Sequence, residues 1–92
     1  MALQFEWDEK KAKINKRKHG ITFEEATTAF ADELSITIDD PIHSEDEDRL
    51  ILIGQSKGFK TLIVIHVEKK ESIRIISARK ATKHEQKFYE EY

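Results

Sequence analysis

Residues 49–78 read RLILIGQSKGFKTLIVIHVEKKESIRIISA, and this stretch decides the fold. It contains three runs rich in Ile, Leu and Val, at residues 49–55, 61–68 and 72–78. Runs of this length and composition are typical of β-strands. The connections between them are only five and three residues long. Connections this short favour antiparallel hairpins, so the second half of the chain is predicted to form the centre of a sheet.

Upstream of these strands, the sequence predicts one short strand and two helices. Residues 3–7 alternate apolar and polar side chains, as a strand does. Asp8 can then cap a helix over residues 9–18, which ends at His19-Gly20 because glycine accepts the left-handed conformation of a helix end. Thr22 is followed three residues later by Glu25, the capping-box spacing that begins a second helix.

The second helix is predicted to pack on the sheet through Phe23, Ala26 and Phe30 and to end at Asp32-Glu33. Residues 34–38 alternate and indicate another strand, followed by a turn and an acidic loop that reaches residue 48.

A last helix begins at Thr82, where Glu85 completes a second capping box. The predicted fold class is therefore α+β. A mostly antiparallel sheet carries the two N-terminal helices on one face and is followed by a C-terminal helix. The 92 residues suffice for one domain, over residues 1–92.

Composition narrows the class of protein. The absence of cysteine excludes disulfides and thiolate metal sites and fits a reducing cytoplasm, where we expect the protein to act. No apolar run is long enough to cross a membrane, and no secretory signal precedes the first strand. Charge is unevenly distributed: residues 1–20 carry +3, residues 21–48 carry −10 and residues 49–92 carry +5. Such a chain can present a basic and an acidic face at once.

Several short motifs, in order along nearly the whole chain, resemble the BrnT family of toxins. They are Phe5-Glu6-Trp7-Asp8, Asn15, Lys18-His19-Gly20 with Phe23 and Ala26, Asp39-Asp40-Pro41 with His43-Ser44, and residues 74–82 (RIISARKAT) with Glu85 and Tyr89. The resemblance implies a RelE-like fold and a ribonuclease that blocks translation by cutting RNA. It also implies a partner antitoxin, BrnA, which neutralises the toxin and carries the complex to operator DNA. A dimer within that complex is in keeping with such systems.

Metal-free RNA cleavage needs a base, an acid and cations that stabilise the transition state, and no cofactor. Arg79 is the first candidate, because it ends the last predicted strand on the same pleat face as Ser77. The alternative is a surface ion pair. Lys18 and His19 are the second candidates, with His19 as base or acid and a helix C-terminal cation as the alternative. Arg49 either binds phosphate or pairs with Asp46 or Asp48.

Four further residues are candidates for RNA contact. Lys80 and Lys83 would extend a phosphate-binding patch beside Arg79. Arg74 alternates with Ile73 and Ile75, so it contacts RNA if its face of the sheet is open. His66 is the fourth, although a lone histidine in the middle of a strand is more often a sheet residue with one hydrogen bond.

Two other functions remain open at this point. The acidic segment with Asp39, Asp40 and His43 superficially resembles a metal loop, but it lacks the glycine and the ligand spacing of a calcium site, so no metal ligand is assigned. A metal-dependent nuclease or hydrolase would have to use this segment. The other alternative is a non-catalytic module that keeps the fold in order to bind an antitoxin and tune repression.

Overall fold

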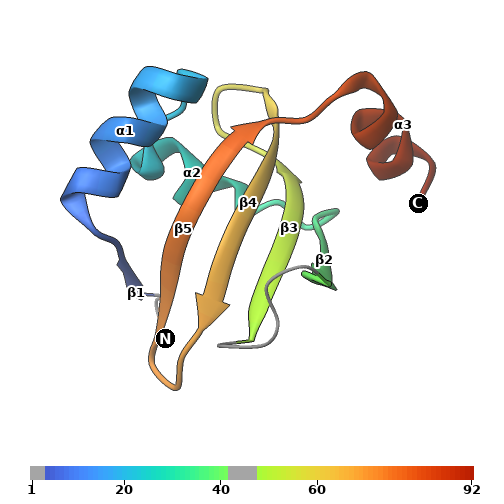
Figure 1. Ribbon diagram of the computed structural model, residues 1–92. Coiled ribbons are helices and arrows are strands. Elements are labelled where there is room, and N and C mark those ends of the chain that lie inside the picture. The colour runs from blue at the N-terminus through green and yellow to red at the C-terminus, as the bar shows by residue number, and fades with distance from the viewer. Residues whose placement is uncertain (1–3, 42–47) are drawn as a thin grey trace.

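The three strands predicted for the second half of the chain form the middle of a curved five-stranded sheet (Figure 1). The computed structural model describes residues 4–41 and 48–92. The sheet order is β1-β5-β4-β3-β2. The strands are β1 (Gln4–Glu6), β2 (Ile36–Asp39), β3 (Arg49–Gln55), β4 (Thr61–Glu68) and β5 (Ser72–Lys80). The two predicted hairpins are confirmed, and β5 continues two residues beyond its predicted end.

The short first strand lies parallel to the last one, which the sequence did not reveal. Its residues 4–6 align with residues 72–74 of β5. Every other strand pair in the sheet is antiparallel. Because β1 spans only three residues, it covers just the first part of the outer edge of β5. The rest of that edge needs another partner.

The three helices are α1 (Glu9–His19), α2 (Phe23–Ala29) and α3 (Lys83–Glu91). The predicted caps are confirmed. Asp8 accepts hydrogen bonds from two first-turn amides, Gly20 ends α1 with φ 74°, and Thr82 and Glu85 form a capping box. Thr22 caps α2 by accepting from Glu25 N.

The second helix ends at Ala29, earlier than the predicted Asp32-Glu33. The Asp32 carboxylate accepts hydrogen bonds from the backbone amides of Leu34 and Gln55, and a side chain that binds backbone amides in this way favours a turn over a helix. Ser35 N also donates to Asp32 O, so β2 begins at Ile36, later than the sequence predicted.

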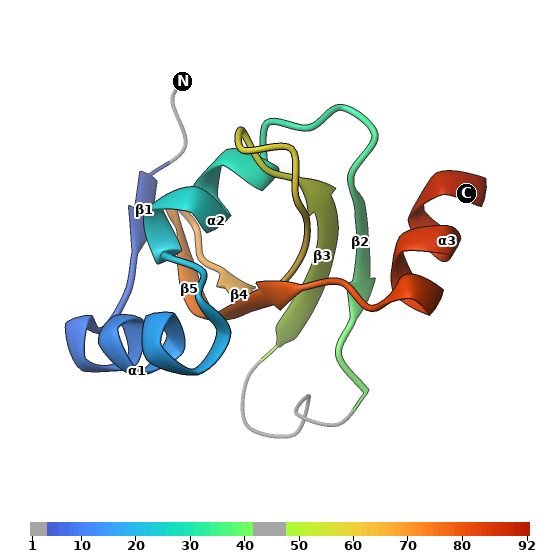
Figure 2. The same ribbon diagram turned by 90° about the horizontal axis from the view of Figure 1, so that it is seen from above.

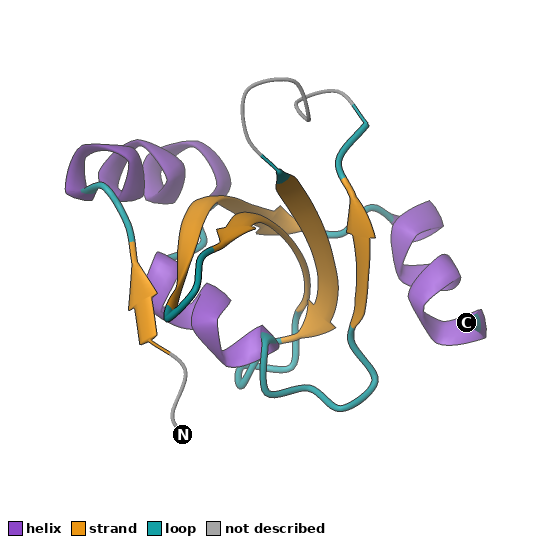
Figure 3. Ribbon diagram, turned by 90° about the horizontal axis from the view of Figure 1, so that it is seen from below, coloured by secondary structure: helices purple, strands orange, loops and turns teal. Residues whose placement is uncertain are grey.

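The core lies between the sheet and the first two helices. Figure 2 shows α2 inside the curve of the sheet and α1 beside β5, and Figure 3 shows the same arrangement from the opposite side. The fully buried side chains of Phe23 and Ala26 confirm the predicted apolar stripe of α2. At Gly54 a Cβ atom would lie 2.9 Å from the carbonyl oxygen of Ala29, so only glycine lets α2 approach β3 this closely.

A bulge in β5 decides which of its side chains face away from the helices. Ile65 is opposite Ser77, whereas the next residue of β4, His66, is opposite Ile75. Ile76 is therefore the extra residue of the bulge. Ile75 and Ala78 are buried against the helices, and both Ile76 and Ser77 line a cleft on the other side, which we call the open face. Bulges commonly redirect side chains next to functional sites.

In the described part of the chain, no helix is long and apolar enough to cross a membrane. The third helix differs from the other two because none of its residues is buried. It lies beyond the β3–β2 side of the sheet (Figures 1 and 2). Its attachment depends on polar contacts, which also involve the candidate site.

His66 is fully buried on the helix side of the sheet. Its ring packs edge-on against Phe30, with centroids 4.8 Å apart, and Nδ1 lies 3.2 Å from Val64 O. Nε2 is buried without a hydrogen-bond partner, and a carboxylate oxygen of Glu68 lies 3.9 Å away from it. Burial lowers the pKa of His66 from 6.5, although the Val64 carbonyl and Glu68 partly oppose this shift.

We predict that the protein loses stability as the pH falls below 6.5, because the unfolded chain then binds a proton that buried His66 resists. The loss is about 1.4 kcal/mol for each unit by which folding lowers this pKa. Urea unfolding between pH 5 and pH 7.5 measures it. His66→Gln should flatten this part of the pH dependence. His84→Gln, which changes an exposed histidine of α3, should leave it intact. Equal slopes for wild type and His66→Gln would contradict the prediction.

Candidate functional site

A cleft of about 280 Å³ on the open face of the sheet brings two arginines together. It is lined by Asp40, Arg49, Ile51, Ile65, Ile76, Ser77 and Arg79. Arg49 begins β3 and Arg79 lies near the end of β5, on opposite sides of β4. Both belong to the candidates named from the sequence. Two guanidinium groups beside an apolar floor and a serine hydroxyl suit the binding of an oxyanion such as a phosphate.

Arg79 is held by a bidentate ion pair with Glu85 of α3. Its two terminal nitrogens donate to the two carboxylate oxygens at 2.8 and 2.9 Å. The hydrogen bonds from Arg79 lower the pKa of Glu85 from 4.5 to about 2, and the same pair raises the pKa of Arg79. The sequence allowed either a phosphate ligand or an ion pair for Arg79. The ion pair is present, and its planar, two-point geometry is also the one by which arginine binds phosphate.

A second polar contact holds the same helix. The Tyr89 hydroxyl donates to the carboxylate of Asp32, which raises the pKa of Tyr89 to about 12. Burial acts to raise the pKa of Asp32, but its hydrogen bonds from Gln55 N, the tyrosine hydroxyl and Leu34 N lower it overall. Glu85 and Tyr89 are four residues apart and therefore lie on one side of α3. Helix α3 is thus attached through two side chains, Glu85 bound to Arg79 of β5 and Tyr89 bound to Asp32 in the segment before β2.

The end of α1 reaches the same end of β5 as Arg79. Asn15 of α1 exchanges hydrogen bonds with both backbone groups of Ala78, the residue before Arg79. Lys18 and His19 follow within the next turn of the helix, and His19 is half-buried whereas Lys18 is exposed. Figure 1 shows the C-terminal end of α1 toward the same end of the sheet as the arrowhead of β5.

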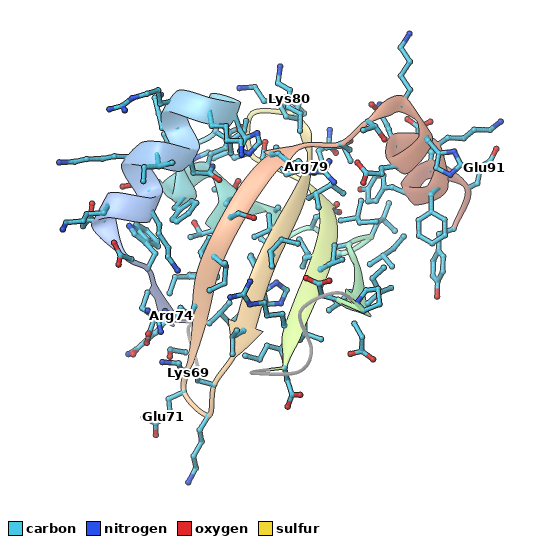
Figure 4. The ribbon with its side chains drawn as sticks, in the orientation of Figure 1. Lys69, Glu71, Arg74, Arg79, Lys80 and Glu91 are labelled. Atoms are coloured by element: carbon cyan, nitrogen blue, oxygen red, sulfur yellow. The ribbon has the colours of Figure 1, made fainter. Side chains whose placement is uncertain are left out.

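The other cations divide into two groups. Lys80 is exposed at the end of β5 and Lys83 is exposed at the start of α3, so both extend the cationic end of the sheet. Arg74 shares the open face but lies toward the opposite end of β5, near Lys69 and Glu71 (Figure 4). The electrostatic influence of Arg74 helps lower the pKa of Glu6 in β1. Arg74 is therefore separate from the cleft.

Three residues that line the cleft or bind its strand were not assigned to the site from the sequence. Asp40 is buried and lines the cleft, but the sequence offered it only as part of an acidic run. Glu85 was read as a capping residue, and it both caps α3 and binds Arg79. Asn15 was named only among the residues that resemble the BrnT family, without a role of its own. The sequence carried no separate signal for Asn15, because its partners Ile21 and Ala78 lie outside the helix.

His66, named as a candidate RNA contact, is not part of this surface. It lies on the helix side of the sheet with no exposed area, so RNA does not reach it in this fold. The interpretation as a sheet histidine with one hydrogen bond matches its contact with Val64 O. His43 and Ser44, with most of the acidic loop, lie outside the described residues. Within residues 4–41 and 48–92, no three histidine, aspartate or glutamate side chains are grouped to hold a metal ion.

Comparisons with known proteins agree with this architecture. A family model described as "Ribonuclease toxin, BrnT, of type II toxin-antitoxin system" matches residues 7–85. The fold is similar to the crystal structure of the Brucella abortus ribonuclease toxin, BrnT, with a TM-score of 0.65 and 25% sequence identity. That match covers 89% of this chain and 100% of the Brucella chain. No curated protein matches the sequence.

We predict that Glu85→Gln lowers the free energy of unfolding at pH 7 by about 1 kcal/mol, since solvent weakens a partly exposed ion pair. A carboxylate with a lowered pKa stabilises the fold above its ordinary value of 4.5, and this contribution disappears as the pH falls toward 2. The difference from wild type should therefore shrink at pH 3 in urea unfolding experiments. Glu91→Gln, an exposed change at the end of the same helix, should match wild type. If the difference in free energy of unfolding between wild type and Glu85→Gln stays constant with pH, Arg79 is not the partner that stabilises Glu85.

Proposed function

Because the chain belongs to the BrnT family of ribonuclease toxins of type II toxin–antitoxin systems, we propose that it cuts RNA at the cleft that contains Arg49 and Arg79. Membership in the family confirms the resemblance read from the ordered motifs. Since the family consists of ribonuclease toxins of toxin–antitoxin systems, the substrate class is RNA and the protein partner is an antitoxin. The observation that carries the proposed site is the convergence of both arginines, from two different strands, on one cleft.

The reaction is a transesterification that needs no metal ion. The 2′-oxygen of a ribose forms a bond to the adjacent phosphorus while the bond from phosphorus to the 5′-oxygen breaks. A base takes the proton of the 2′-hydroxyl, and an acid returns a proton to the departing 5′-oxygen. Arg79 and Arg49 contribute fixed positive charge where the phosphate becomes more negative in the transition state.

Proton transfer falls to His19 at the end of α1, where Lys18 adds positive charge. A neutral imidazole carries one nitrogen that accepts a proton and one N–H group that donates, so a histidine side chain is suited to act as base or acid. The link from Asn15 to Ala78 supports this placement, because it holds α1, one turn before His19, against the strand that carries Arg79.

RNA binding draws on the exposed lysines at the same end of the sheet. Within the described part of the chain, Lys80 and Lys83 make no ion pair, so both are available to neutralise phosphates. Cleavage of messenger RNA at this surface inhibits translation. The antitoxin is of the BrnA type, and the neutralised complex contains two copies of the toxin and binds DNA only through the antitoxin.

We predict that Arg79→Ala cuts a labelled RNA roughly 100- to 1000-fold more slowly than wild type in the presence of excess chelator, because one preorganised donor to the transition state is lost. The assay uses purified protein and single-turnover conditions. Glu85→Gln is the matched control, since it breaks the same ion pair but keeps the guanidinium. It should retain cleavage.

The two variants separate the guanidinium from the docking of α3. Equal losses in Arg79→Ala and Glu85→Gln would show that only the attachment of α3 matters. Loss of wild-type cleavage in chelator would favour a metal-dependent nuclease. A wild type that binds its antitoxin but cuts neither free RNA nor messenger RNA on ribosomes would be the non-catalytic module.

We predict that removing Lys80 and Lys83 together weakens RNA binding and makes it less dependent on salt. Each lost phosphate contact should reduce the slope of log affinity against log salt by roughly 0.7 for single-stranded RNA. Lys70→Ala, an exposed lysine in the turn between β4 and β5 at the opposite end of the sheet, serves as the control and should leave the slope unchanged. Fluorescence anisotropy at several salt concentrations measures both. An unchanged slope in the double variant would remove these lysines from the RNA-binding surface.

A further inference from the structure

The buried polar side chain of α1, Asn15, makes contacts that no neighbouring residue duplicates. It is 6% exposed, whereas Ile14 beside it is 58% exposed. Its side-chain nitrogen donates to Ala78 O at 2.7 Å and to Ile21 O at 3.0 Å, and its side-chain oxygen accepts from Ala78 N at 3.1 Å. One amide therefore connects α1, the segment between α1 and α2, and β5.

The contacts at Ala78 replace a missing strand. In an antiparallel pair, the N–H and C=O groups of one residue point to the same side of the strand. At Ala78 both groups point away from β4 and toward α1, where the last strand alignment with β1 has already ended at Arg74. Ala78 is fully buried, so both groups need partners. The Asn15 amide presents one donor and one acceptor, as the backbone of a neighbouring strand would.

This connection lies next to both halves of the proposed site. Ser77 and Arg79, on either side of Ala78, line the cleft. His19 is four residues after Asn15, one helical turn further along the same side of α1. The ion pair with Glu85 holds the guanidinium of Arg79, whereas Asn15 holds the backbone from which that side chain extends.

We propose that Asn15 is a positioning residue of the ribonuclease site, which fixes the end of β5 with Arg79 and the end of α1 with His19 in one arrangement. This inference rests on the proposed function, because it assumes that Arg79 acts on RNA. Asn15 itself does not touch the substrate, since its amide is already occupied by three backbone groups. Its removal therefore affects the rate of the reaction more than the binding of RNA.

The test compares wild type with Asn15→Leu, which keeps a similar volume and loses all three hydrogen bonds. Hydrogen exchange followed by NMR should show the Ala78 amide exchanging at least about tenfold faster, as expected for one lost hydrogen bond. Amides of the β3–β4 pairing should stay protected. The kcat for a labelled RNA should fall roughly 100-fold, because a small displacement of a catalytic group has effects of this size. The KM should stay within about threefold of wild type, because the phosphate-binding cations are retained.

The control is Ile14→Ala, an exposed change one residue away, which should reproduce wild type in exchange, kcat and KM. Asn15→Gln keeps the amide but moves it by one methylene, so it should fold and still lose kcat; it replaces Asn15→Leu if that variant does not fold. A folded variant at Asn15 with wild-type kcat, or with unchanged Ala78 exchange, would overturn the inference alone. A wild type that cleaves no RNA would overturn the proposed function and, with it, a role for Asn15 in the reaction.

Discussion

The outer edge of β5 is the constraint on which the rest of this structure depends. This strand carries Arg79 at one end, and only three residues of β1 cover its other end. Backbone groups that are buried without partners destabilise a fold, so the uncovered part of the edge must be satisfied by something other than a strand. Helix α1 lies along this edge and contributes one side-chain amide at Ala78. Because α1 directly follows β1, it covers the part of the β5 edge that β1 leaves open. It also brings the polar residues at its C-terminal end, Lys18 and His19, toward that edge.

Specific contacts of the acidic middle segment, residues 21–48, explain how the uneven charge of the sequence is accommodated in the fold. Two acidic residues of the middle segment are used structurally: Glu25 accepts from Ser56 Oγ and pairs with Lys60, and Asp32 accepts from two backbone amides and Tyr89. They hold loops and α3 in place and neutralise few of the cations at the end of β5. A surface that is basic locally can therefore exist on a protein whose net charge is −2. Net charge alone was a poor guide to an interaction with RNA.

What could be predicted from the sequence is what local chemistry determines. The caps at Asp8, Gly20 and Thr82 depend on residues within one turn, and β3 and β4 were delimited by their own composition. The end of α2 was misplaced because Asp32 binds Gln55, more than twenty residues away. The parallel pairing of β1, the bulge at Ile76 and the partners of Asn15 depend in the same way on distant segments. Periodicity does not report such contacts.

The same distinction applies to the site. That Arg79 shares a pleat face with Ser77 followed from strand geometry, and both line the cleft. The sequence offered two interpretations of Arg79, as a phosphate ligand and as half of an ion pair; the structure shows the ion pair with Glu85, and phosphate binding stays a proposal. A carboxylate and a phosphate oppose the same two guanidinium nitrogens, so Glu85 and an RNA phosphate would compete for Arg79. Glu85 holds the guanidinium group before substrate arrives, and this ion pair must be exchanged when RNA binds. Since none of the residues of α3 is fully buried, little besides the hydrogen bond from Tyr89 to Asp32 opposes that exchange.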